Sequence, residues 1–221
     1  MILPTILEKK FEEIQKKLSA LEGVVSLVQI DMADGDLVDG ITFLDIEKLD
    51  TLDFSGNLEI HLMVKNPTNF LENKIKKVKS ICAQVEATAE IPEFIEKSKV
   101  LGYRVGISVN ISTPMSLVEP LVEVLDFVQF MCIAEPGAQG RGFDPSVLDK
   151  TSEFKHKYPD VEIQADGSVN TETLPLLKDV GVEKFAVGSA IFKTGNVVKN
   201  YEKLEQLAHG KEKTDNIVSW T

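Results

Sequence analysis

The sequence predicts an α/β fold in which eight parallel strands alternate with helices and close into one (β/α)8 barrel, the TIM-barrel architecture. Short apolar runs alternate with longer amphipathic stretches along the chain, a pattern typical of strands joined by helical crossovers. The runs number eight, and 221 residues is an ordinary length for one such barrel. An open, doubly wound sheet is the alternative arrangement of the same elements.

Each expected strand is a short run rich in β-branched or aromatic residues, with turn-forming residues at its borders. These features and the shortness of the runs favour strands over buried helices. The expected strands are Ile2–Thr5, Val25–Asp31, Leu58–Met63, Ser80–Glu86, Arg104–Asn110, Phe127–Ile133, Glu162–Ala165 and Lys184–Val187.

The helices are expected between these strands. Phe11, Ile14 and Leu18 recur at helical spacing in the first of them. Two others begin with proline, which suits a first helical turn, and a fourth begins with the N-cap-type Asn170 and stops before Gly181. The expected helices are Glu8–Leu21, Pro92–Leu101, Pro145–Lys157, Asn170–Val180 and 196–209. We therefore expect one barrel domain over 1–209 and a polar tail over 210–221 outside it.

The composition is that of a soluble, acidic globular protein. Hydrophobic residues make up 43% of the chain, which is enough for one sizeable core, and the net charge is -11. Such a charge disfavours nucleic acid and anionic membranes as partners. Cys82 and Cys132 lie in apolar runs, as buried free thiols do in a reducing compartment. With no signal segment or membrane-spanning run in the sequence, we expect a cytoplasmic protein.

Polar residues gather where the expected strands end, which in a barrel is the catalytic face. Each residue alone has a structural explanation, such as a satisfied core histidine at His61 or a helix cap at Asp31. Several such polar residues at the same end of the barrel together favour a functional site. The segments are 29–35, 61–64, Gln84 and Glu86, 108–110, 135–140, 166–168 and 188–189.

Strand periodicity adds to this hypothesis. Alternate residues of a strand share a face, so Gln29 and Asp31 point the same way, as do Gln84 and Glu86. Inward-facing polar pairs are costly to desolvate unless they build a polar site.

The ordered motifs at the strand ends resemble the ribulose-phosphate 3-epimerase family and its ketohexose-phosphate relatives. The resemblance covers roughly Ile2 to Phe192, and its specificity lies in the order and placement of motifs that are weak alone. They are Asp31-x-x-Asp34-Gly35, His61-Leu62-Met63-Val64, Asn110-x-x-Thr113-Pro114, Glu135-Pro136-Gly137, Asp166-Gly167 and Gly188-Ser189. The resemblance implies a barrel of the ribulose-phosphate-binding type and an isomerase of carbohydrate metabolism, in the pentose phosphate pathway.

The resemblance also implies the chemistry, which is inversion at C3 of a ketose phosphate such as ribulose 5-phosphate. Asp31 and Asp166 would be the two acid/base carboxylates on opposite faces of the carbon. A divalent metal (Zn, Fe, Mn or Mg) would stabilise the enediolate. Its ligands would be Asp31, His61, Asp166 and, where the family usually has histidine, Gln29.

The substrate is expected to be a small sugar phosphate, and the protein a possible homo-oligomer. Its phosphate would lie after strands 7 and 8, where barrels commonly bind phosphate and glycine permits close backbone approach. The residues expected to bind substrate or phosphate are Glu8, Met63, Gly137, Ala138, Gln139, Gly140, Gly167, Ser168, Gly188 and Ser189.

Departures from the family pattern leave alternatives open. Gln29 and Gln84 stand where histidine is usual, and Arg141 follows the strand 6 loop. In one interpretation the site keeps a metal, with its preference shifted toward oxygen-preferring ions. In a second it binds metal weakly or not at all. In a third the protein acts on another phosphosugar, such as allulose 6-phosphate. A non-catalytic sugar-phosphate binder is a further alternative. A related lyase is disfavoured, because Met32 and Ala33, not a lysine, stand between Asp31 and Asp34.

Overall fold

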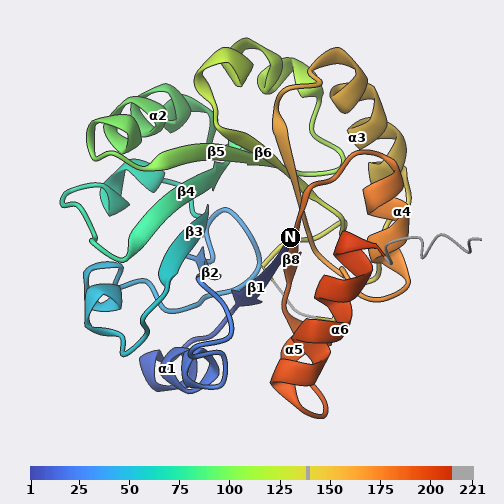
Figure 1. The fold of residues 1–221 in the computed structure, drawn as a ribbon. Coiled ribbons are helices and arrows are strands. Elements are labelled where there is room, and N and C mark those ends of the chain that lie inside the picture. Colours follow the sequence, from blue (N-terminus) through green and yellow to red (C-terminus); the bar gives the residue numbers. More distant parts are fainter. Residues whose placement is uncertain (138–139, 211–221) are drawn as a thin grey trace, which may run out of the picture.

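A computed structural model describes residues 1–137 and 140–210. Its eight parallel strands pair in sequence order, and β8 pairs with β1, so the barrel is closed as predicted (Figure 1). The strands are β1 Ile2–Ile6, β2 Leu27–Ala33, β3 Asn57–Met63, β4 Val78–Gln84, β5 Arg104–Val109, β6 Phe127–Met131, β7 Glu162–Asp166 and β8 Lys184–Val187.

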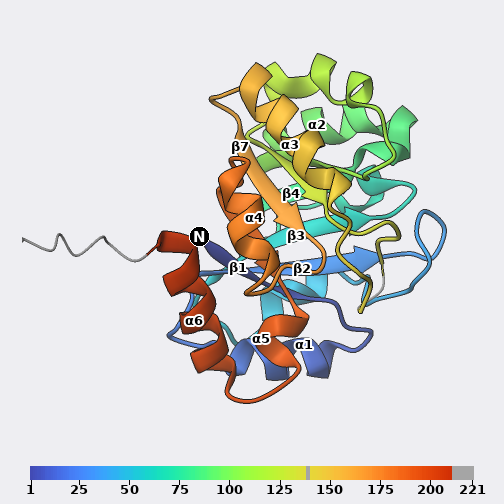
Figure 2. The ribbon, with the colours of Figure 1, turned by 90° about the vertical axis from the view of Figure 1, so that its right-hand side faces the viewer.

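The α-helices surround the barrel on its outside (Figures 1 and 2). They are α1 Phe11–Ser19, α2 Ile91–Val100, α3 Ser146–Lys157, α4 Thr173–Asp179, α5 Ser189–Phe192 and α6 Val197–His209. Five of them lie within two or three residues of an expected helix, and α5 is an addition after β8. The other crossovers contain short 3-10 helices at Glu47–Thr51, Pro67–Phe70, Met115–Leu117 and Glu119–Val124, and one at Val85–Glu90 precedes α2.

Two strands are displaced by about two residues from their expected positions. Val25 donates its backbone N–H to Leu21 and so belongs to the turn after α1, and β2 runs on to Ala33 instead. Val85 and Glu86 begin a 3-10 helix rather than ending β4. In both places an apolar run continues through a turn, so hydrophobicity alone does not mark the end of the strand.

The apolar core lies between the strands and the helices, where α1 buries Ile14 and Leu18 and α2 buries Phe94. Cys82 and Cys132 are buried free thiols, as predicted. The inside of the barrel is different. A continuous register row joins Gln84, Ser108, Gln129, Gln164 and Lys184, and all five are buried. Most barrels fill this space with branched apolar side chains, so this barrel has a polar interior.

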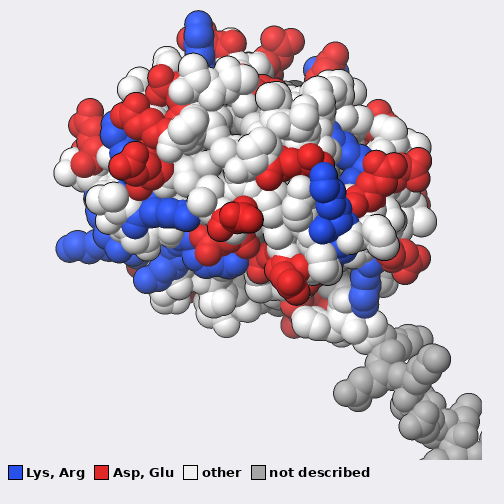
Figure 3. Space-filling view, turned by 90° about the horizontal axis from the view of Figure 1, so that it is seen from above, with Lys and Arg blue, Asp and Glu red and all other residues white. Residues whose placement is uncertain are grey.

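On the face seen in Figure 3, acidic and basic side chains are interspersed. None of the helices over 1–137 and 140–210 combines the length and the apolar character needed to cross a membrane.

Candidate active site

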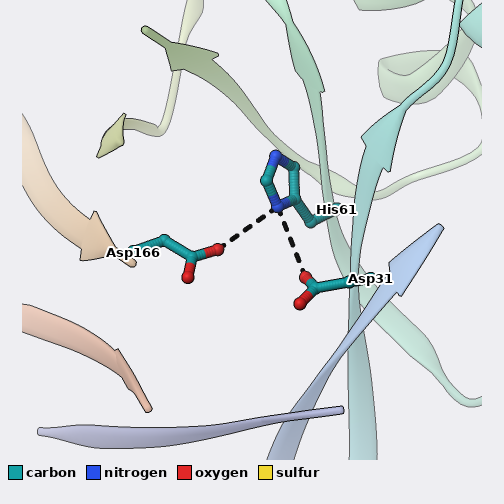
Figure 4. Close-up of side chains that lie close together, drawn as sticks. All are labelled: Asp31, His61 and Asp166. Atoms are coloured by element: carbon teal, nitrogen blue, oxygen red, sulfur yellow. Dashed lines mark ion pairs between the residues drawn. The ribbon is translucent and has the colours of Figure 1, made fainter. Parts of the chain in front are cut away.

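Asp31, His61 and Asp166 meet inside the barrel at the carboxyl ends of β2, β3 and β7 (Figure 4). Asp31 and His61 are direct register partners on neighbouring strands. The Nδ1 atom of His61 lies 3.3 Å from Asp31 Oδ1 and 3.3 Å from Asp166 Oδ2. The imidazole is fully buried, and the carboxylates are nearly so. Asp31 and Asp166, predicted as proton carriers and ligands, and His61, predicted as a ligand, therefore form one cluster.

The charges of the cluster shift the pKa values of its members. Burial alone would lower the pKa of His61, but its hydrogen bonds to Asp166 and Asp31, and their charges, raise that pKa to about 9. Burial, and then the charge of Asp31, raise the pKa of Asp166. Perturbed pKa values of buried groups that lie close together are typical of functional sites.

The raised pKa of His61 predicts how stability depends on pH. Because its folded pKa of about 9 exceeds its ordinary value of 6.5, the folded state binds this proton more tightly. The stabilisation is complete below pH 6.5 and is lost as pH rises through about 9. In chelator-treated protein, the free energy of unfolding of wild type relative to His61→Gln should fall over this range. His156→Gln, an exposed change on α3, is the control. If the free energy of unfolding depended on pH equally in wild type, His61→Gln and His156→Gln, the prediction would be contradicted.

The cluster fits a divalent cation with three protein ligands. One ligand atom from each of Asp31, His61 and Asp166 lies within 4.8 Å of the others. Imidazole and carboxylate ligands suit Zn, Fe or Mn. Gln29 is placed differently from its predicted role, because its Nε2 atom, rather than its Oε1, faces the carboxylates (2.8 Å to Asp31 Oδ1 and 3.0 Å to Asp166 Oδ2). Its role as a ligand stays a prediction.

A cavity opens above the cluster, between the loops that follow the strands. It is lined by both catalytic candidates and by most residues expected to bind substrate, namely Asp31, Asp166, Met63, Gly137, Gly140, Gly167, Ser168, Gly188 and Ser189. Gly167 and Ser168 both have positive φ angles, 104° and 54°. Glycine adopts such an angle freely, but a non-glycine residue such as Ser168 does so at a cost, and backbone of this kind is often found at ligand sites. Here it is where phosphate was expected.

Some expected site residues lie elsewhere. Glu8 is not among the residues that line this cavity, and it forms an ion pair with Lys17 of α1 (2.7 Å). Ala138 and Gln139 lie outside the described residues. Glu86 accepts hydrogen bonds from the backbone N–H of Asn110 (3.0 Å) and from the hydroxyl of Thr113, so it fixes the loop after β5.

Sequence reasoning missed three side chains of the site. Thr5 of β1 lines the cavity and donates from Oγ1 to Asp31 Oδ2 (2.9 Å). Gln129 of β6 places Nε2 3.2 Å from Asp166 Oδ2. Met131 of β6 lines the cavity and is the register partner of Asp166 on the neighbouring strand β7. Thr5 and Gln129 are lone polar residues in apolar strands, and this pattern in the sequence could have identified them as site residues.

Solved structures share the fold at low identity. They include KGPDC from Streptococcus mutans (TM-score 0.72, 11% identity, covering 94% of this chain and 96% of that one). Another is orotidine 5'-monophosphate decarboxylase from Sulfolobus solfataricus (TM-score 0.67, 10% identity, covering 94% and 97%).

Curated relatives are similar over most of their length. They include ribulose-phosphate 3-epimerase from Bacillus subtilis, which is 30% identical over 200 residues (86% of this chain and 91% of the relative). The cytoplasmic isoform from Oryza sativa is 28% identical over 198 residues (86% of each chain). The sequence also matches the Ribulose-phosphate 3 epimerase family over residues 1–192. The chain therefore belongs to the ribulose-phosphate 3-epimerase family.

Proposed function

We propose that the protein is a cytoplasmic ketose-phosphate 3-epimerase that interconverts ribulose 5-phosphate and xylulose 5-phosphate. The observation that carries the proposal is the buried Asp31–His61–Asp166 cluster at the base of a cavity on the catalytic face of the barrel. The relatives named for this activity support the choice of substrate. The retained pair of carboxylates favours catalysis over simple binding, because two carboxylates repel an anionic ligand that is only bound.

In this proposal the two carboxylates exchange a proton with C3 of the substrate. Asp31 removes the proton from one face, and Asp166 delivers a proton to the other. The raised pKa of Asp166 suits the group that holds a proton at the start of this direction. The reverse reaction uses the same groups in exchanged roles. Thr5 and Gln129 keep the carboxylates oriented by the hydrogen bonds described above.

Asp31, His61 and Asp166 would hold the divalent cation, as their placement within 4.8 Å of one another permits. When bound, such a cation offsets negative charge that develops on the substrate oxygens. The burial of His61 and the low exposure of both carboxylates keep bulk water from the reacting groups, which strengthens every electrostatic interaction there.

The phosphate end of the substrate would lie at Gly167, Ser168, Gly188 and Ser189, with Arg141 above them. Arg141 is the one basic side chain among the described residues that line the cavity. Its guanidinium is 45% exposed and lies 2.9 Å from Glu135 Oε2. A planar guanidinium binds phosphate oxygens well, so we propose that Arg141 exchanges Glu135 for the phosphate when substrate binds.

Replacing Arg141 with glutamine should therefore raise the KM for the ketose phosphate about tenfold or more, with kcat little changed. A hydrogen bond to a charged group contributes about 1.5–3 kcal/mol, and this one acts on substrate and transition state alike. Steady-state kinetics would measure it. Arg104→Gln is the matched control, since Arg104 begins β5 at the opposite end of the barrel. A fall in kcat at unchanged KM would contradict this role.

The activity itself is tested by incubating the protein with ribulose 5-phosphate and each of Zn²⁺, Fe²⁺, Mn²⁺ and Mg²⁺ in deuterated water. We expect deuterium at C3 and formation of xylulose 5-phosphate, both visible by NMR. Allulose 6-phosphate is tested in parallel, because Arg141 alters the substrate loop. Exchange with allulose 6-phosphate alone would reassign the substrate. Tight binding of both sugars without exchange would instead indicate a binding protein.

A further inference from the structure

Beneath the cluster, the barrel interior contains a hydrogen-bond network that ends on the catalytic carboxylates. At its base Glu59 of β3 and Lys184 of β8 form an ion pair of 2.9 Å, and both side chains are almost wholly buried. Ser80 donates to the same oxygen, Glu59 Oε2 (2.5 Å). The other oxygen, Glu59 Oε1, lies 2.8 Å from Gln164 Nε2.

The carboxylate of Glu59 determines which way the amide of Gln164 points. An ionised carboxylate only accepts hydrogen bonds, so the amide of Gln164 must direct its NH2 group toward it. The same Nε2 lies 2.7 Å from Gln29 Oε1 and 2.6 Å from Gln129 Oε1. Both of these amides therefore turn their Oε1 atoms toward Gln164, and these two oxygens and Glu59 Oε1 share the two hydrogens of its NH2 group. The orientation follows from the network and not from the shape of any one side chain.

Because their oxygens face Gln164, the amides of Gln29 and Gln129 direct their NH2 groups toward the Asp31–His61–Asp166 cluster. Gln29 Nε2 donates to Asp31 Oδ1 and Asp166 Oδ2, the same two oxygens that contact His61 Nδ1. Gln129 Nε2 lies 3.2 Å from Asp166 Oδ2. The oxygens expected to bind a cation are thus already engaged by neutral donors, which supply part of what a cation would supply.

We infer that Gln164, held by the Glu59–Lys184 ion pair, is a positioning residue that locks Gln29 as a hydrogen-bond donor to the catalytic carboxylates and thereby weakens cation binding. Gln29 then competes with the cation for Asp31 and Asp166 instead of serving as its fourth ligand. The inference relies on the proposed function only for calling those aspartates catalytic, because its tests use metal-free protein and metal binding without turnover.

The first test is the NMR signature of the side-chain amides in metal-free, full-length protein. In wild type, the NH2 protons of Gln29 and Gln129 should be shifted from ordinary values and slow to exchange with water. Gln164→Met is similar in size but has no donor, so the shifts and the protection of both amides should be lost. Gln84→Met is the matched control, since Gln84 lies in the same buried row but near Asn110. Unchanged Gln29 and Gln129 resonances in Gln164→Met would overturn the inference.

The second test measures Mn²⁺ affinity by calorimetry and does not depend on how Gln164→Met folds. Gln29→Met removes the donor and leaves the two carboxylates free to bind a cation. We expect the Mn²⁺ affinity to rise at least threefold relative to wild type and to Gln84→Met, with the circular dichroism spectrum preserved. A ligand role for Gln29 requires the affinity to fall. A smaller rise, no change or a fall would each overturn the inference, whatever the activity of the enzyme.

Discussion

Asp31→Asn and Asp166→Asn should each slow epimerisation by about three orders of magnitude, since a positioned acid or base contributes about 10²–10⁴-fold. Both carboxylates are buried within 3.3 Å of the same imidazole nitrogen. An asparagine amide preserves much of the side-chain shape but cannot take the proton from C3. The effect should therefore appear in kcat, while KM for the sugar phosphate changes much less.

The two variants should differ in the face of the substrate that they still attack. Ribulose 5-phosphate and xylulose 5-phosphate present the C3 proton to opposite carboxylates. Each variant should therefore lose deuterium exchange from one sugar and retain it from the other. The measurement is C3–H washout by NMR, started separately from each pure sugar in deuterated water.

The matched control is Asp36→Asn, an exposed aspartate in the loop after β2. Its turnover and exchange should stay close to those of wild type. If both site variants lost exchange from both sugars equally while remaining folded, a single base serving both faces would replace the two-carboxylate mechanism. Full activity in either variant would remove that aspartate from the chemistry altogether.

The sequence alone was sufficient for the barrel and for the cluster at its centre. Asp31, His61 and Asp166 could be found because each follows an apolar run, and parallel strands bring their carboxyl ends to one face. The glycines that follow β7 and β8, where phosphate is expected, could be identified for the same reason. They line the same cavity as Asp31 and Asp166.

The partners across the barrel could not be predicted in this way. Periodicity places Gln29 and Asp31 on one face, but it does not reveal that Gln164 contacts Gln29 from the far side of β8 and β1. Lys184 is the first residue of an expected strand, and the sequence pattern does not show that it is buried against Glu59. Such contacts depend on register and barrel closure, and the direction of an amide depends on its neighbours.

Glu8 shows that a contact close in sequence can also be hard to predict. The family resemblance, and not a local pattern, implies a substrate contact for Glu8, and that contact stays a prediction. Two other residues determine the geometry around it. Lys17, on the facing side of α1, pairs with Glu8, and Thr5 occupies the cavity wall. An ion pair between a loop and the following helix leaves no mark in hydrophobic periodicity.

Lys184→Met should destabilise the protein strongly although it lies outside the Asp31–His61–Asp166 cluster. The side chains of Lys184 and Glu59 are 3% and 0% exposed, so removing the lysine leaves a buried carboxylate without its counter-ion. Breaking a buried pair by removing one partner costs about 3–5 kcal/mol. At about 2–4 °C per kcal/mol for a chain of this size, Tm should fall by about 10 °C.

The double variant Glu59→Leu/Lys184→Met should recover much of that loss, because replacing both partners with apolar side chains leaves no buried charge. The exposed pair of Lys155 and Glu183, 3.2 Å apart, provides the control. Lys155→Met should lower the free energy of unfolding by no more than about 1 kcal/mol. Calorimetric unfolding of the four proteins would measure these differences. If Lys184→Met were as stable as wild type, Ser80 and Gln164 alone would satisfy the carboxylate of Glu59. If the double variant were less stable than Lys184→Met, the ion pair would itself be a net source of stability.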